Sequence, residues 1–68
     1  MKLLNKWEIS AWAYYQCLKG NDTEEIRSLI VHDYWAYKYC FDMKNDSKVR
    51  KYITSNQYIR ILKRYYMF

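Results

Sequence analysis

The sequence predicts an all-α fold, a solenoid-like bundle of about six short helices built from 23-residue helical repeat units. Proline is absent and glycine occurs once, at position 20, so few residues interrupt a helix. Aromatic residues make up 21% of the 68 residues, and each ring can bury roughly 150–250 Å², so this short chain can still build a core. The third observation is a residue pattern that returns after 23 positions.

Residues 11–33 and 34–56 align in one register. The matching positions are Trp12 and Trp35, Ala13 and Ala36, Tyr14 and Tyr37, Cys17 and Cys40, Leu18 and Phe41, Ile26 and Val49, Arg27 and Arg50, and Ile30 and Ile53. The frame continues toward both ends of the chain with weaker matches. We therefore expect a single domain, 1–68, with units at about 1–10 (partial), 11–33, 34–56 and 57–68 (a partial cap).

The six expected helices lie near residues 2–9, 11–19, 23–32, 34–43, 47–55 and 57–66. Ser10, Asp33 and Asn56 stand 23 residues apart, each directly before an aromatic-rich run. Their short polar side chains suit N-cap positions, because each can accept from an unpaired N–H of a first helical turn. Gly20 suits the left-handed position that follows a helix end.

The second helix of each unit has its own start residues. Asp22 with Glu25 three positions later is expected to form a capping box, and Asn45, Asp46 and Ser47 fall in the equivalent place of the next unit. Helices of about ten residues do not persist alone in water. Their stability must therefore come from packing each unit against the next.

The residues expected to fill the space between helices are Trp12, Trp35, Tyr58, Ile26, Leu29, Ile30, Val49, Ile53 and Leu62. Small Ala13, Ala36, Cys17 and Cys40 would let neighbouring helices approach closely. The two cysteines allow a disulfide, a metal pair or plain packing. Packing is favoured, because equivalent helices lie about 8–10 Å apart whereas a disulfide needs Cα atoms within about 7 Å.

The units resemble the short tandem helical repeats of many small proteins from bacteriophages and other mobile elements. In those proteins a Tyr/Trp-Ala-Tyr-x-Tyr-Ala/Cys helix precedes an apolar-Lys-Gly turn, an acidic helix start and a second helix containing Ile. The matching residues are Trp12-Ala13-Tyr14-Tyr15, Cys17, Leu18-Lys19-Gly20, Glu25 and Ile30, and then Trp35-Ala36-Tyr37-Lys38-Tyr39-Cys40. The Lys-Gly turn and the Glu are missing from the second unit. The resemblance implies a phage or mobile-element origin and does not imply an activity.

The sequence contains no arrangement typical of an enzyme or a cofactor site. His32, the only histidine, has Asp33 beside it but no third ligand at suitable spacing. The acidic group Asp22, Glu24 and Glu25 lies at an expected helix start, where negative charge offsets the helix dipole. We expect no catalytic residues, no metal and no cofactor.

The sequence has no apolar run of about 18 residues, so we expect no membrane-spanning helix. Its first residues also lack the apolar stretch and small-residue cleavage site of a signal peptide. A cytoplasmic protein with reduced thiols is the expectation, in the host cell if the origin is a phage.

Positive charge is concentrated in the last third of the chain. Residues 1–43 carry a net charge of −1, and residues 44–68 carry +6. The residues predicted to contact a partner are Lys48, Arg50, Lys51, Tyr58, Arg60, Lys63, Arg64 and Tyr65. The segment 49–64 can also be interpreted as a helix-turn-helix with its turn at residues 54–56.

Three hypotheses of function remain. The first is a non-enzymatic protein-binding module, phage-encoded, that inhibits or modulates a host or defence protein, because Tyr, Trp and Arg are common interface anchors. The second is a small basic nucleic-acid-binding protein that uses the C-terminal third. The third is self-association as a homodimer, because the open ends of such a fold expose apolar surface.

Overall fold

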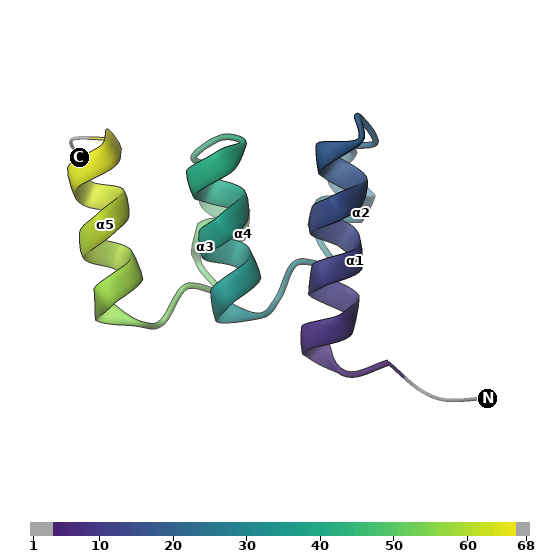
Figure 1. The fold of residues 1–68 in the computed structure, drawn as a ribbon, viewed down its shortest axis with the longest axis horizontal. Coiled ribbons are helices and arrows are strands. Elements are labelled where there is room, and N and C mark those ends of the chain that lie inside the picture. The colour runs from purple at the N-terminus through teal and green to yellow at the C-terminus, as the bar shows by residue number, and fades with distance from the viewer. Residues whose placement is uncertain (1–3, 67–68) are drawn as a thin grey trace.

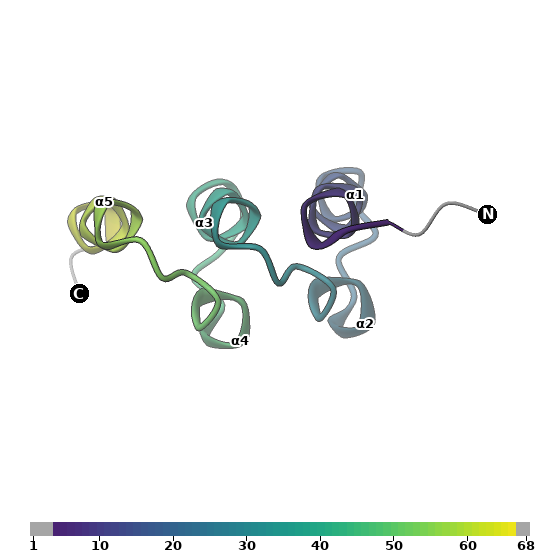
Figure 2. The same ribbon diagram turned by 90° about the horizontal axis from the view of Figure 1, so that it is seen from below.

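Five helices follow one another in the computed structural model, which describes residues 4–66. They are α1 (Lys6–Leu18), α2 (Glu24–Arg27), α3 (Asp33–Asp42), α4 (Ser47–Arg50) and α5 (Asn56–Tyr66). The described residues contain no strand, so the all-α prediction is confirmed. The long helices α1, α3 and α5 stand side by side in one row, and the short helices α2 and α4 form a second row behind them (Figures 1 and 2).

The first helix corrects the prediction of six helices. α1 continues through Ser10, where two helices were expected to meet, and its N-cap is Asn5, whose side chain accepts from the Glu8 N–H at 2.8 Å. Residues 2 and 3, the start of the first expected helix, lie outside the described residues. The expected break is absent because the Ser10 side chain bonds to a distant segment, and nothing else near it interrupts the helix.

The second-row helices are shorter than predicted. α2 and α4 each have four residues, and after each the chain continues as a tighter turn in which N–H groups bond to carbonyls three residues back. These turns bring Ile30 and Ile53 into the core, where both are buried. Thr23, not Asp22, is the N-cap of α2, so the predicted capping box does not form. Asp46 is the N-cap of α4, one of the three residues, 45–47, at which this helix was predicted to start.

The end of α1 matches the prediction at Gly20. Its φ is 105°, a left-handed conformation that costs glycine little because it has no Cβ. The Asn21 N–H bonds to the Gln16 carbonyl at 2.9 Å, and the Gly20 N–H bonds to the Cys17 carbonyl at 3.1 Å. These two hydrogen bonds together form a Schellman motif, in which the last carbonyls of the helix find N–H partners.

Ser10 and Asp33 bond to backbone further along the chain instead of capping their own helices. The Ser10 hydroxyl accepts from the N–H groups of Val31 and His32, both at 3.0 Å. Asp33 Oδ1 accepts from the N–H groups at 54 and 55, at 2.7 and 3.2 Å, and its Oδ2 accepts from the hydroxyl at 55. Both side chains fasten the turn that precedes the next long helix. His32 caps α3, and Asn56 is already the first residue of α5.

The core lies between the two rows and between neighbouring long helices. Its buried apolar residues are Ala13, Tyr14, Cys17, Ile30, Trp35, Ala36, Tyr39, Cys40, Val49, Ile53 and Leu62. Tyr58 and Ile26 are partly buried against it. The prediction was wrong for Trp12 and Leu29, which are 50% and 40% exposed. Trp12 is exposed because no described helix covers that side of α1.

Both cysteines are free and buried, which confirms that they are packing residues. Burial raises the pKa of each thiol to about 11. No helix within residues 4–66 is long and apolar enough to cross a membrane.

Candidate functional site

The structure divides the predicted contact residues between two surfaces. Lys48 and Lys51 belong to α4 and its C-terminal end, where they border a groove between α2 and α4. Arg60, Lys63 and Arg64 are exposed on α5. We call these three α5 residues the α5 basic face.

The groove between α2 and α4 has a volume of about 520 Å³ and a mixed charge. Arg27 reaches Asp22 at 2.9 Å and Asp46 at 3.6 Å, so its guanidinium is neutralised within the fold. Lys48 pairs with Glu24 at 2.7 Å, and their hydrogen bond lowers the pKa of Glu24 and raises that of Lys48. Because both side chains are largely exposed, this pair contributes little to stability. Arg27 and Lys48, two of the cations that border the groove, are therefore already paired with carboxylates of this chain.

Two of the predicted contact residues take part in packing. The Tyr58 ring is stacked on Tyr37, with centroids 4.4 Å apart and planes 8° from parallel. Arg50 donates to the Asn45 side chain at 2.9 Å and borders a smaller cavity of about 220 Å³ beside α5. Tyr65 is exposed and rests on Phe41 at 4.6 Å. One face of the Tyr58 ring is thus covered within the fold, whereas Tyr65 remains accessible.

The α5 basic face follows from the amphipathic pattern of α5. One side of this helix packs on the core through Leu62, with Tyr58, Ile59 and Tyr66 partly buried beside it. Arg60, Lys63 and Arg64 occupy the positions between these residues and are exposed to solvent. None of the three forms an ion pair with an acidic side chain within residues 4–66.

The equivalent positions on α3 have a different role. Tyr37 and Phe41 of α3 receive the rings of Tyr58 and Tyr65, which dock α5 onto α3. The residues 23 positions after Tyr37 and Phe41 are Arg60 and Arg64. α5 therefore presents cations where α3 presents rings to the next helix, and no described helix covers α5 on that side (Figure 2).

The helix-turn-helix interpretation does not fit this geometry. Its first helix would be α4, which is a single turn of four residues. α5 instead packs beside α3, with both helices upright in the same row (Figure 1). A helix-turn-helix requires two full helices that cross at roughly 90–120°.

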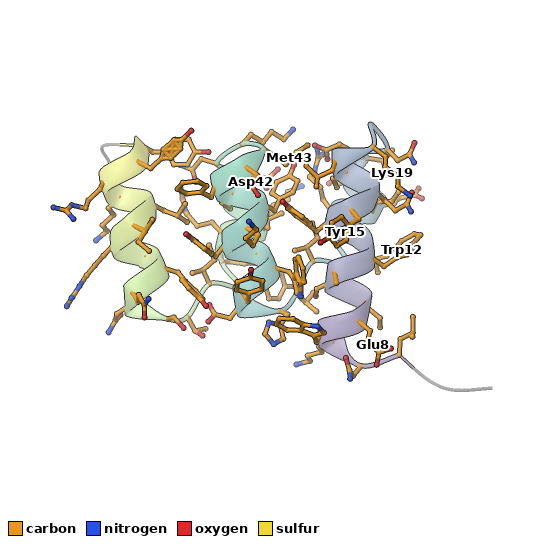
Figure 3. The ribbon with its side chains drawn as sticks, in the orientation of Figure 1. Glu8, Trp12, Tyr15, Lys19, Asp42 and Met43 are labelled. Carbon is orange, nitrogen blue, oxygen red and sulfur yellow. The ribbon has the colours of Figure 1, made fainter. Side chains whose placement is uncertain are left out.

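Sequence reasoning missed a second exposed surface, on α1. Trp12 and Tyr15 are 50% and 52% exposed, and Trp12 and Lys19 lie on the side of α1 away from α3 (Figure 3). Trp12 was assigned to the core because it matches Trp35, which is buried against rings of α1. The matching triplets at 12–14 and 35–37 are alike in sequence, so nothing in these residues distinguishes the exposed Trp12 from the buried Trp35.

The remaining polar groups of interest serve the fold. The buried Tyr39 hydroxyl donates to Asp22 at 2.9 Å, and burial together with this bond raises the pKa of Tyr39. Tyr14 donates to Asp42, and its pKa is likewise raised by burial and by that carboxylate. The His32 Nδ1 accepts from a backbone N–H as the cap of α3. Within residues 4–66, no three His, Cys, Asp or Glu side chains are placed to hold a metal ion.

Comparison with known proteins gives no family. No protein-family model matches the chain, and neither the curated proteins nor the solved structures contain a significant match.

Proposed function

We propose that this chain is a non-enzymatic protein-binding module that docks on an acidic protein surface through the α5 basic face. The observation that carries the proposal is the set of three exposed cations on α5, on a side that no described helix covers and with no described acidic partner. Arginine suits this role because its planar guanidinium can bond to a carboxylate through two parallel hydrogen bonds.

The fold itself does not require these cations. Lys63 and Arg64 are in the last turn of α5, where positive charge interacts favourably with the helix dipole. Arg60 is one turn earlier, three and four residues before the other two, and like charges at these spacings destabilise a helix by a few tenths of a kcal/mol. If the outer face of α5 served only to keep the protein soluble, a mixture of acidic and basic residues would do this equally well. An acidic partner supplies the missing opposite charge.

The proposal extends to architecture and origin. We propose that the chain is built from 23-residue helical repeat units, with α5 as a terminal unit whose outer face is polar. In this interpretation the Trp-Ala-Tyr triplets at 12–14 and 35–37 are the first-helix residues of successive units. Their likeness to phage and mobile-element repeats supports a partner in the host cytoplasm, either a host protein or a defence protein, that is inhibited or modulated by binding.

Nucleic acid is the alternative occupant of the same face, and the geometry favours it less. Affinity for duplex DNA that rests on charge grows with the number of phosphates that the protein neutralises, and α5 offers three cations for this. Base stacking needs free aromatic faces, and Tyr58 is stacked within the fold. Lys48 is paired with Glu24.

Affinity capture from host lysate tests the proposal, with the wild-type chain compared to the variant Arg60→Glu/Arg64→Glu. We expect one protein partner that is retained after nuclease treatment and lost with this variant. The control variant, Lys6→Glu/Lys44→Glu, changes the net charge equally at exposed positions outside α5 and should retain the partner. Failure to capture a specific protein, or a signal removed by nuclease, would contradict the proposal.

A further inference from the structure

The outer face of α1 has a symmetric arrangement of charge and aromatic rings. Glu8, Trp12, Tyr15 and Lys19 follow one another at spacings of four, three and four residues, which places them near one another around an α-helix. Trp12 and Lys19 point away from α3, and Tyr15 lies at the edge of this face that is nearer α3 (Figure 3). We call these four residues the α1 outer face. At 1.5 Å per residue they form a stripe about 16 Å long, with an acidic residue at one end, a basic residue at the other and two rings between them.

A second copy of this stripe, placed antiparallel to the first, is complementary to it in charge. A two-fold axis that crosses α1 midway between Trp12 and Tyr15 exchanges these two residues, and it also exchanges Glu8 with Lys19. In an antiparallel pair of α1 helices, each Glu8 would therefore meet Lys19 of the other chain, and each Trp12 ring would meet a Tyr15 ring. A closed dimer requires a patch of this kind, one that is complementary to its own rotated copy.

From this arrangement we infer that the protein forms a homodimer in which two α1 outer faces pack antiparallel about a two-fold axis. The charges that the contact would use are not engaged elsewhere. Neither Glu8 nor Lys19 forms an ion pair with a side chain in the described part of the chain. The two helix dipoles also run in opposite directions in such a pair, which is favourable.

Both rings are available to a partner, and the Tyr15 ring is held in position. Trp12 and Tyr15 each expose about half of their surface. The Tyr15 ring is supported by Tyr14 at 5.2 Å and by Trp35 at 5.8 Å, so little side-chain freedom is lost when it is covered. Trp and Tyr are the side chains that most often dominate interface energetics.

The small area of the interface between the two α1 outer faces sets the expected affinity of the dimer. One helix face on each chain buries less than the roughly 1,200 Å² of a stable standard interface, so the dissociation constant should lie in the micromolar to millimolar range. α1 and α5 are at opposite ends of the molecule (Figure 1). A dimer through α1 therefore leaves both α5 basic faces exposed and makes the protein bivalent toward a partner, which increases avidity.

Sedimentation equilibrium on the full chain tests the dimer over roughly a hundredfold range of concentration. We expect the mass to rise from monomer to dimer and to stop there. Glu8→Lys or Lys19→Glu places like charges opposite each other at both ends of the interface, and each should weaken the dimer about tenfold or more. The double variant Glu8→Lys/Lys19→Glu restores both pairs and should recover the dimer, as should a mixture of the two single variants.

The charge reversals separate this interface from a general loss of stability. Both changes oppose the dipole of α1, so the double variant has the least stable helix, and its recovery cannot come from improved folding. Leu29→Ser removes a different exposed apolar side chain and should leave association unchanged, while Trp12→Glu should abolish it with the helical circular dichroism retained. A wild-type chain that stays monomeric, growth beyond dimer, or a double variant that does not recover would each overturn the inference. None of these outcomes depends on a partner for α5.

Discussion

Replacing Ser10 with alanine tests the claim that one buried hydroxyl fastens the turn between α2 and α3. Ser10 is completely buried in the middle of α1. Its oxygen accepts from the N–H groups of Val31 and His32 at 3.0 Å and donates to the Leu29 carbonyl at 3.3 Å. Alanine removes one oxygen atom, and the space left is too small for a water molecule, so both N–H groups lose their partner.

The magnitude follows from these two donors. An unsatisfied buried N–H costs about 1–3 kcal/mol, and allowing for some relaxation we expect Ser10→Ala to lower the free energy of unfolding by about 2–4 kcal/mol. A domain of 68 residues has a total stability of about 3–10 kcal/mol, so this loss would be a large fraction of the free energy of unfolding.

Urea denaturation followed by far-ultraviolet circular dichroism measures this loss. Ser28→Ala is the matched control, because Ser28 is exposed and its hydroxyl only donates to the Glu25 carbonyl three residues earlier. The control should change the free energy of unfolding by less than about 0.5 kcal/mol. If Ser10→Ala lowered the free energy of unfolding no more than Ser28→Ala does, the Ser10 hydroxyl would not be what holds the turn between α2 and α3.

Two further predictions concern titration and thiol chemistry. Burial would raise the pKa of Asp33, but hydrogen bonds from the hydroxyl and N–H of Ser55 and from the N–H of Thr54 outweigh it, and the pKa lies below its ordinary value of 3.8. A lowered folded-state pKa stabilises the fold above the unfolded-state value and loses that contribution as the pH falls through the folded-state value. Asp33→Asn should therefore be less stable at neutral pH and show a flatter decline of stability below about pH 5, as measured by denaturation at several pH values; an unchanged slope would refute the assignment. Because burial raises the thiol pKa of Cys17 and Cys40 to about 11, iodoacetamide at neutral pH should modify them only after denaturant is added, as followed by mass spectrometry. Rapid labelling of the native chain would show that the thiols are accessible.

The positions of the long helices could be predicted from the sequence, but the continuation of α1 through Ser10 could not. The expected helices at 34–43 and 57–66 correspond to α3 and α5. The expected helices at 2–9 and 11–19 are one helix, because serine can accept either from its own first turn or from a distant backbone, and sequence does not distinguish these cases. The same ambiguity applies to Asp33. Periodicity also overestimated α2 and α4, because apolar spacing is similar in an α-helix and in the tighter turn that follows each of them.

The candidate surfaces were likewise predictable from the sequence only in part. The concentration of charge after residue 44 was evident in the sequence. Only the structure shows that Arg60, Lys63 and Arg64 share an uncovered side of α5, whereas Lys48 is paired with Glu24. The α1 outer face was missed because the sequence likeness of residues 12–14 and 35–37 predicted the same buried environment for Trp12 and Trp35.

The sequence by itself determined the features of this protein that depend on local chemistry. These are its helical class and the left-handed turn at Gly20, and the sequence also favoured packing for Cys17 and Cys40, which the structure shows as buried free thiols. They follow from backbone propensity, from the absence of a Cβ in glycine and from the small apolar character of cysteine. Tertiary structure decided every feature that depends on a neighbour. Trp12 and Trp35 stand in matching positions, and only the presence of α1 beside Trp35 makes one of them core and leaves the other on the surface.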